Sequence, residues 1–254
     1  MYVTHGPCPK CGSRDNLGTY KDGHQWCFGC GYHVRTERSL GDRVQSVSRN
    51  DQTIVQNGLQ SIPNDASKHL GYEGLRWIKQ YGITDEELQR YNVMWSDDKR
   101  QLIFPIYDAE GMLLAWQARN FDPELLSKRK YYTAGRIDEV LYILRMGGHY
   151  YHNRLDINSS ICLVEDVASA IKLSRYIPAM PLFGSHISTQ RLNRLRLIFN
   201  RVVVWLDRDK AKNAYKGALM ASQMGFATQV VVTELDPKDL SDEIIKKELY
   251  EFAI

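Results

Sequence analysis

Short apolar runs alternate with longer amphipathic stretches in the C-terminal part of the chain. The segments 161–164, 202–206 and 228–234 are rich in β-branched side chains and too short for buried helices, so they predict strands. The two segments that lie between these strands, 168–176 and 210–224, carry apolar residues at helical spacing and predict helices. This β-α-β-α-β alternation predicts a mostly parallel sheet with right-handed crossovers, which is an α/β fold.

The middle of the chain has a different pattern. Residues 75–81 carry apolar side chains at helical spacing, and Thr84-Asp-Glu-Glu87 has the form of a capping box that begins a second short helix. Two runs with strand character follow, at 101–107 and 112–119. Helices followed by adjacent strands predict a mixed α+β subdomain.

Four of the five cysteines lie in the first thirty residues, in the pairs Cys8-Pro-Lys-Cys11 and Cys27-Phe-Gly-Cys30. Two Cys-x-x-Cys pairs at this separation predict one tetrahedral zinc site with four thiolate ligands. Because no coordination position stays open, we expect the zinc to be structural. The segments 17–20 and 24–27 predict a hairpin between the pairs, so the module is a small zinc ribbon.

The aromatic and basic side chains of this ribbon suit contacts with unpaired bases. We expect Phe28 to contribute to the small core of the ribbon. His33 and Arg35, which follow the last cysteine, are the better candidates for contact with a nucleic-acid template.

The composition agrees with a soluble globular protein, at 43% apolar and 25% charged residues with a net charge of +3. No apolar run approaches the ~20 residues that span a bilayer, and no secretory signal precedes Cys8, so we expect a cytoplasmic protein that does not engage a membrane.

The polar stretch before residue 69 predicts a flexible linker. We therefore expect a zinc ribbon at 1–38, a linker at 39–68, the basic α+β subdomain at 69–155 and the α/β domain at 156–254.

Carboxylates follow the predicted strands of the α/β domain. Glu165 follows the first strand, Asp207 and Asp209 follow the second, and Asp239 lies beyond the third. Because parallel strands end at one edge of a sheet, we expect these side chains to converge in one crevice. Packed carboxylates repel one another unless a cation joins them. The pattern predicts a site for one or two Mg²⁺ or Mn²⁺ ions, which is the usual equipment for phosphoryl transfer.

Basic residues close to aromatic ones mark the end of the middle segment. Arg119 ends the second predicted strand there, and Lys128 and Lys130 precede Tyr131-Tyr132. Such a group indicates phosphate and base contacts, although a solvated charged loop would have the same composition.

This order of parts resembles the phage-type DNA primases and, more distantly, the bacterial replicative primases. The resemblance rests on the ribbon, on Glu165 with Asp207-Arg-Asp209, and on segments that look like the basic polymerising subdomain of that family, Arg100–Gly111, Ala115–Arg119 and Lys130–Gly135. It implies that the α/β domain is a TOPRIM domain. The first motif departs from the family pattern, because Val167 and Ser169 stand where acidic residues are frequent.

The resemblance implies roles for individual residues. Glu165, Asp207 and Asp209 would be catalytic and would bind Mg²⁺ or Mn²⁺, with Asp239 as the last acidic position. Arg119, Lys128 and Lys130 would hold nucleotides or DNA, and His33 and Arg35 would contact the template.

The implied activity is synthesis of short RNA primers from ribonucleoside triphosphates on single-stranded DNA by two-metal nucleotidyl transfer. The zinc ribbon would select the template site. The sequence contains no Gly-x-x-x-x-Gly-Lys-Ser/Thr loop, so we expect a separate replicative helicase as partner, in the cytoplasm of a host cell if the chain comes from a phage. The alternatives are a TOPRIM nuclease with the same metals and a non-catalytic zinc-ribbon protein that binds DNA during replication.

Overall fold

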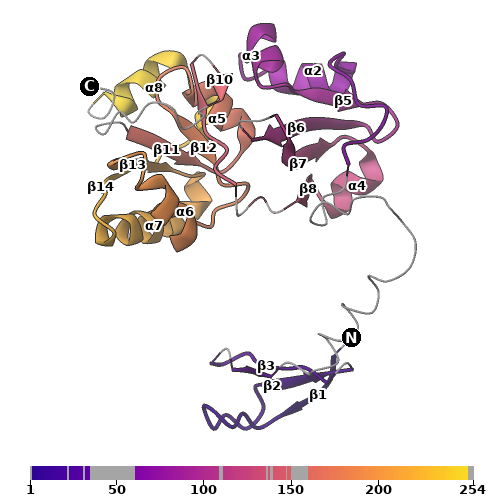
Figure 1. Cartoon of the computed structure of the whole chain (residues 1–254), viewed down its shortest axis with the longest axis vertical. Helices are drawn as coiled ribbons and strands as arrows, with labels where there is room; N and C mark the ends of the chain where they lie inside the picture. Colours follow the sequence, from indigo (N-terminus) through magenta and orange to yellow (C-terminus); the bar gives the residue numbers. More distant parts are fainter. Residues whose placement is uncertain are drawn as a thin grey trace. The chain divides into compact units, whose positions relative to one another are not determined.

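The chain folds into two compact units, Met1–Val55 and Gln56–Ile254 (Figure 1). The computed structural model describes residues 2–21, 23–30, 32–34, 61–108, 111–135, 137, 140–146, 148–149 and 160–250. Most of the predicted linker, Arg35 and the predicted boundary at 155 lie outside these residues.

The N-terminal unit is a four-stranded antiparallel sheet in sequence order. The predicted hairpin is present as its two central strands. The outer two strands lacked a signal of their own because they are short or polar. The strands are β1 (Tyr2–Gly6), β2 (Leu17–Tyr20), β3 (Gln25–Cys27) and β4 (His33–Val34).

The core of this unit consists of Cys8, Leu17 and Cys27 with Cys30 and Tyr32 packed against it. The expectation that Phe28 belongs to this core is wrong, since 58% of its surface is exposed. Phe28 lies in the turn between Cys27 and Cys30, whose sulfur atoms belong to the four-cysteine cluster. A sheet this small is filled by its sulfur cluster.

The second unit begins with an antiparallel sheet in the order β5-β6-β7-β8, accompanied by three short helices. The predicted strands at 101–107 and 112–119 are confirmed as β6 and β7. The elements are α2 (Tyr72–Lys79), α3 (Asp85–Arg90), β5 (Met94–Ser96), β6 (Gln101–Tyr107), β7 (Leu113–Asn120), α4 (Pro123–Lys128) and β8 (Tyr131–Gly135).

The capping box at the start of α3 is confirmed. Thr84 Oγ1 accepts the backbone N–H of Glu87, and Glu87 Oε2 accepts the backbone N–H of Thr84 at 2.8 Å. Gly82, at a φ of +70°, turns the chain from α2 toward this cap.

Residues 61–68, which we assigned to the linker, pack against the core. Ser67 and Trp95 form a β-bridge, and Asp65 accepts hydrogen bonds from the Ser96 hydroxyl and the Asp98 backbone N–H. Their polar composition hid this attachment, because the contacts are hydrogen bonds made by short side chains and by the main chain.

A six-stranded mixed sheet completes the unit, in the order β10-β9-β12-β11-β13-β14. Strands β11, β13 and β14 are parallel, as predicted, β12 is a further parallel strand, and β9 and β10 add an antiparallel edge. The elements are β9 (Leu144–Arg145), β10 (Gly148–His149), β11 (Ser160–Val164), α5 (Val167–Leu173), β12 (Ala179–Pro181), α6 (Thr189–Leu195), β13 (Arg201–Trp205), the 3₁₀ turn η2 (Arg208–Lys210), α7 (Ala211–Gln223), β14 (Ala227–Val230), η3 (Pro237–Asp239) and α8 (Asp242–Leu249).

Two details of this sheet differ from the prediction. The strand β12 has only three residues between two helices, which is too short to give a period of its own. The third predicted strand is also shorter than expected, because the chain leaves the ladder after Val230 although Val231 still donates to the carbonyl of Val204.

Helices cover both faces of the parallel sheet, with α5 and α8 on one face and α6 and α7 on the other (Figure 1). Alternate side chains of a strand pack on opposite faces of the sheet. In β13, Val203 and Trp205 pack with α5 and α8, whereas Val202 and Val204 pack with α6 and α7.

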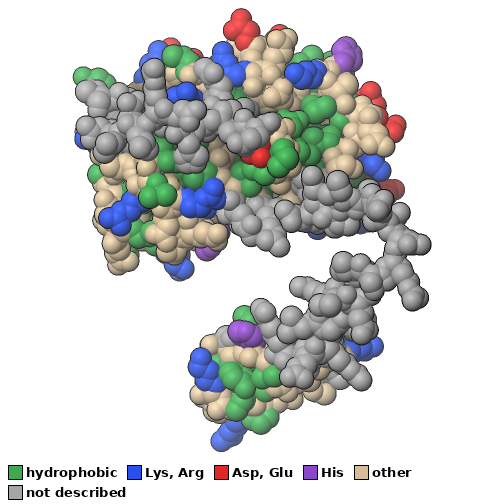
Figure 2. Space-filling model, viewed as in Figure 1, with side chains coloured by type: hydrophobic (Ala, Val, Ile, Leu, Met, Phe, Trp, Pro, Cys, Tyr) green, Lys and Arg blue, Asp and Glu red, His purple; other side chains and the backbone are tan. Residues whose placement is uncertain are grey.

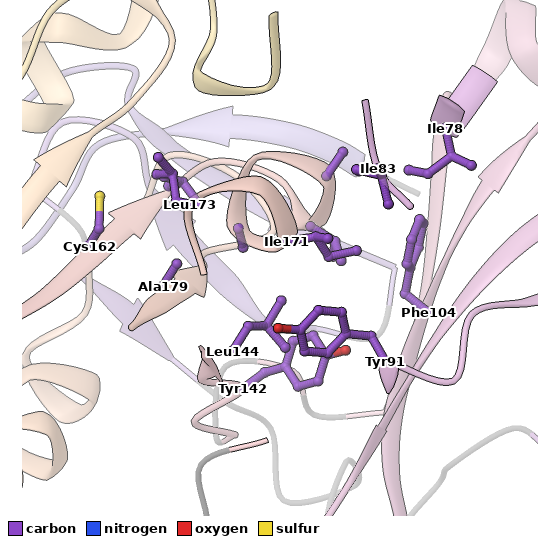
Figure 3. Packing of buried hydrophobic residues seen from close by; sticks show 14 of the residues in the cluster. Ile78, Ile83, Tyr91, Phe104, Tyr142, Leu144, Cys162, Ile171, Leu173 and Ala179 are labelled. Carbon is purple, nitrogen blue, oxygen red and sulfur yellow. The ribbon is translucent and has the colours of Figure 1, made fainter. Parts of the chain in front are cut away.

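The α5 layer continues into the antiparallel subdomain, so both subdomains share one core. Figure 3 shows Ile171 of α5 close to Tyr91 and Leu144 in this cluster. The hydroxyl of Tyr91 lies 2.8 Å from the Ser174 hydroxyl and donates to the carbonyl of Arg145. This shared core fixes the two sheets to each other and so defines the crevice between them.

Candidate active site

A pocket of about 620 Å³ lies where the two subdomains meet, at the carboxyl edge of the parallel sheet. Acidic residues from the sheet form one wall, and aromatic and basic residues from α2, β7 and β8 form the other. Its lining residues are Trp77, Tyr81, Gln117, Arg119, Lys130, Tyr131, Thr133, Glu165, Asp166, Phe183, Gly184, Asp207, Asp236, Lys238 and Asp239.

Glu165 directly follows the central strand β11, Asp207 follows β13 after Leu206, and both are partly buried. Burial, with the nearby carboxylate of Glu165, raises the pKa of Asp207 to about 7. Burial also raises the pKa of Glu165, and its Oε2 is enclosed without a hydrogen-bond partner. A divalent cation would supply the missing partner and relieve the repulsion. These residues therefore fit a Mg²⁺ or Mn²⁺ ion.

Asp209 differs in position from its neighbour. The chain turns into η2 after Asp207, so the two aspartates do not lie on one extended segment. The carboxylate of Asp209 is exposed and pairs with Lys210, and Asp209 is not among the residues that line the pocket. Asp239 does line it. The structure thus brings three of the four predicted carboxylates into one pocket, with Asp209 at its outside.

The carboxylates do not form a closed cluster. In the part of the chain that the structure describes, only the four cysteines bring three or more possible ligand atoms this close together. Water molecules would therefore complete the coordination of a cation at Glu165 and Asp207, as is usual for Mg²⁺.

Asp166 has a structural task at the N-terminus of α5. Its Oδ1 accepts the backbone N–H of Ser169, and its Oδ2 accepts a hydrogen bond from Lys238 at 2.9 Å. Lys238 also donates to Asp236 at 2.5 Å. The acidic wall of the pocket therefore contains a positive charge of its own.

Arg119 is held by aromatic rings on the opposite wall. Its guanidinium carbon lies 4.5 Å from the ring centre of Trp77, 5.6 Å from that of Phe121 and 5.5 Å from that of Tyr131. Its Nε is buried without a hydrogen-bond partner. Cation–π contacts of this kind fix a guanidinium in place while leaving its N–H groups available for phosphate oxygens.

The other predicted basic residues are placed differently. Lys130 lines the pocket, whereas Lys128 is exposed at the end of α4 and lies outside it. His33 is exposed in the separate N-terminal unit, stacked on Trp26 at 5.7 Å between ring centres. Figure 2 shows basic side chains scattered over the visible face of the second unit.

The four predicted zinc ligands lie together. Their sulfur atoms are all within 4.8 Å of one another, with Cys8–Cys30 and Cys11–Cys27 separations of 3.7 Å. Zinc–sulfur bonds of about 2.3 Å in a tetrahedron place the sulfurs about 3.8 Å apart. A hydrogen bond with Ser13 lowers the pKa of Cys11 to about 6, whereas burial and the hydrogen bonds with the other three cysteines raise the pKa of Cys30.

Sequence reasoning missed Trp77, Tyr81 and Lys238 as pocket residues. The side chains of Trp77 and Tyr81 have the helical spacing of core residues, and nothing in one sequence shows that they face a pocket. Asp239 was predicted as a carboxylate of the site, but the ion pair between the neighbouring Lys238 and Asp166 spans 72 positions and leaves no local pattern.

Comparisons with known proteins agree with this arrangement. No protein-family model matches the sequence. A DNA helicase/primase of Enterobacteria phage T3 is 47% identical over 124 residues, which are 48% of this chain and 21% of that protein. The chain therefore spans about a fifth of the length of the curated relative that it matches.

Three solved structures share the fold. The primase fragment of the bacteriophage T7 primase-helicase has a TM-score of 0.50 and 17% identity, with 99% of each chain covered. The zinc-binding and RNA polymerase domains of the Aquifex aeolicus primase have a TM-score of 0.54 and 14% identity, covering 100% of this chain and 80% of that one. The DnaG primase catalytic domain bound to single-stranded DNA has a TM-score of 0.54 and 15% identity, covering 70% and 71%.

The fold is that of a zinc-ribbon primase with a TOPRIM-type catalytic core. Within that class, its similarity in sequence is to a phage helicase/primase, so the expected phage-type resemblance is confirmed. Among the described residues, no helix is both long and apolar enough to cross a membrane.

Proposed function

We propose that this chain is a DNA primase, which makes short RNA primers from ribonucleoside triphosphates on single-stranded DNA. The observation that carries the proposal is that Glu165, Asp207, Arg119 and Lys130 all line one pocket. Acidic residues on one side suit a divalent cation, and basic residues opposite them suit the phosphates that such a cation would share.

The residues of the chain divide the work as follows. Glu165 and Asp207 would hold one or two Mg²⁺ or Mn²⁺ ions, with Asp239 and Asp209 at the margin. A cation held there would supply the charge that lowers the pKa of a primer hydroxyl and neutralises the triphosphate. Arg119 and Lys130 bind phosphate oxygens, and Tyr131 and Trp77 hold Arg119 at its position.

The zinc ribbon would hold Zn²⁺ at its four cysteines and select the template site through exposed groups such as Trp26 and His33. Both are stacked on the surface of the ribbon, which suits contact with unpaired bases. Arg35 and Lys128 stay candidates for contact with DNA. We also propose that a replicative helicase works with this chain in the host cytoplasm, since the phage T3 relative is a helicase/primase by name.

Product analysis tests the reaction class. The full chain with zinc and Mg²⁺ or Mn²⁺ is incubated with mixed-sequence single-stranded DNA, with label either in the ribonucleotides or in the DNA. We expect short labelled RNA and intact DNA. Shortened DNA without RNA would instead indicate a TOPRIM nuclease, and neither product would indicate a non-catalytic DNA-binding protein.

A further inference from the structure

Lys238 occupies an unusual place for a lysine, inside the acidic wall of the pocket. Its Nζ donates to Asp166 Oδ2 at 2.9 Å and to Asp236 Oδ2 at 2.5 Å. Only 12% of its side chain is exposed, against 14% for Asp166 and 30% for Asp236. Ion pairs this enclosed are poorly screened by water, so the arrangement is persistent.

Both oxygens of Asp166 are engaged. One caps α5 through the backbone N–H of Ser169, and the other accepts from Lys238. A cation at Asp166 would have to displace either a helix cap or a buried ammonium, so Asp166 is not available as a metal ligand while Lys238 is in place.

The main chain around Lys238 is fixed as well. Lys172 of α5, which is 7% exposed, donates to the carbonyl of Lys238 at 2.9 Å and to that of Leu240 at 2.5 Å. Pro237 precedes Lys238 and restricts the turn η3. Helix α5 therefore holds Lys238 at two points, by its N-cap Asp166 and by Lys172 about two turns later.

We propose that Lys238 is a fixed cation of the active-site pocket, whose ammonium takes the space between Asp166 and Asp236 where a second divalent ion would otherwise bind. The divalent cation is then confined to the side of Glu165 and Asp207. Lys238 is in this account a positioning residue, and the inference rests on the proposed metal site of the primase.

Metal binding without substrate tests this directly. The zinc-loaded full chain is titrated with Mn²⁺, and free Mn²⁺ is followed by electron paramagnetic resonance. We expect Lys238→Met to bind one more Mn²⁺ than wild type, or to bind Mn²⁺ at least tenfold more tightly, because Asp166 and Asp236 are released. Lys238→Arg keeps the charge and should behave as wild type. Lys247→Met removes an exposed lysine of α8 and controls for net charge.

The double variant Asp166→Asn with Lys238→Met should lose the gain. Equal number and affinity of Mn²⁺ sites in wild type and folded Lys238→Met would overturn the proposal, as would a gain in Lys247→Met of the same size. Thermal unfolding in the absence of Mn²⁺ establishes that each variant is folded. If Lys238→Met is not, Lys238→Ala, which also removes the ammonium and leaves no donor, takes its place under the same criteria.

The outcome is separable from the proposed function. No RNA synthesis by wild type, together with a gain of Mn²⁺ binding in Lys238→Met, would overturn the proposed primase activity and support the fixed cation. A chain that makes RNA, with unchanged Mn²⁺ binding in Lys238→Met, would do the reverse.

Discussion

At the scale of single residues, the pocket places carboxylates where burial works against their charge. Asp207 is the clearest case, because burial and the carboxylates of Glu165 and Asp236 together raise its pKa from 3.8 to about 7. On one side of the pocket, the ammonium of Lys238 neutralises part of the negative charge of these carboxylates. The remaining charge at Glu165 and Asp207 is what a divalent cation would neutralise.

Metal binding should therefore release a proton in mildly acidic solution. A carboxyl group with a raised pKa in the folded state keeps its proton between about pH 4 and pH 7, so the metal-free protein loses stability as the pH rises through that window. Calorimetry of Mg²⁺ binding in buffers of different ionisation enthalpy should report roughly one proton released at about pH 6 and roughly none at about pH 8. Heats independent of the buffer at the lower pH would contradict the assignment, and Asp207→Asn should abolish the release.

The pocket also predicts different effects for two basic residues, one that lines it and one outside it. Arg119→Gln removes a caged guanidinium, so the KM for ribonucleotides should rise by about tenfold or more, as expected for a charge-assisted hydrogen bond of about 1.5–3 kcal/mol. Lys128→Gln removes an exposed charge outside the pocket and should change KM little. Steady-state RNA synthesis on one template measures both, and equal effects would argue against the role of the pocket.

At the scale of elements, helix α5 joins the site to the rest of the core. Its N-terminus carries the cap Asp166, and its buried Lys172 holds η3. Just beyond its end, Arg175 donates two hydrogen bonds to Glu87 of α3, at 2.6 and 2.8 Å. Burial alone would raise the pKa of Glu87, but the hydrogen bonds from Arg175 and Thr84 outweigh it and lower that pKa.

Breaking this pair should destabilise the core. Arg175→Met leaves Glu87, whose side chain is 7% exposed, without its partner, so the free energy of unfolding at neutral pH should fall by about 3 kcal/mol. Urea unfolding measures the change, with exposed Arg76→Met of α2 as a control expected within about 0.5 kcal/mol. Since the pKa of Glu87 is lowered, the Arg175–Glu87 pair stabilises the protein at neutral pH and loses this effect as acid protonates Glu87. The difference in unfolding free energy between wild type and Arg175→Met should therefore shrink at low pH. A deficit that stays constant into acid would count against the pair as its cause.

Elements with a strong local signal were the predictable part of the fold. The run at 101–107, the capping box at Thr84 and the four cysteines each follow from neighbouring residues, and each is confirmed. The position of Glu165 and Asp207 in one pocket also followed, because the rule for parallel strands needs only strand order.

The missed features depend on distant parts of the chain. Strand β12 is short and stable only within its sheet, and the Lys238–Asp166 and Arg119–Trp77 contacts join separate elements. The expectation for Phe28 failed because hydrophobicity alone does not show that a sulfur cluster fills the ribbon.

At the scale of the whole molecule, the ribbon and the catalytic core are separate compact units. Their stabilities should therefore be independent. Cys27→Ser should abolish the binding of one zinc ion, as measured by metal analysis, and should unfold the ribbon, because four thiolates supply most of its core. The melting transition of the core should stay at the wild-type temperature. A core transition that moves with the loss of zinc would show that the two units unfold together.

The measurement that tests the account most directly is RNA synthesis by wild type, Asp207→Asn and Asp98→Asn on mixed-sequence single-stranded DNA with Mg²⁺ or Mn²⁺. Asp98 is an exposed aspartate outside the pocket and provides the matched control. We expect short labelled RNA from wild type and Asp98→Asn, and a loss of about a hundredfold or more in Asp207→Asn. Full RNA synthesis by a folded Asp207→Asn variant would contradict the proposed active site.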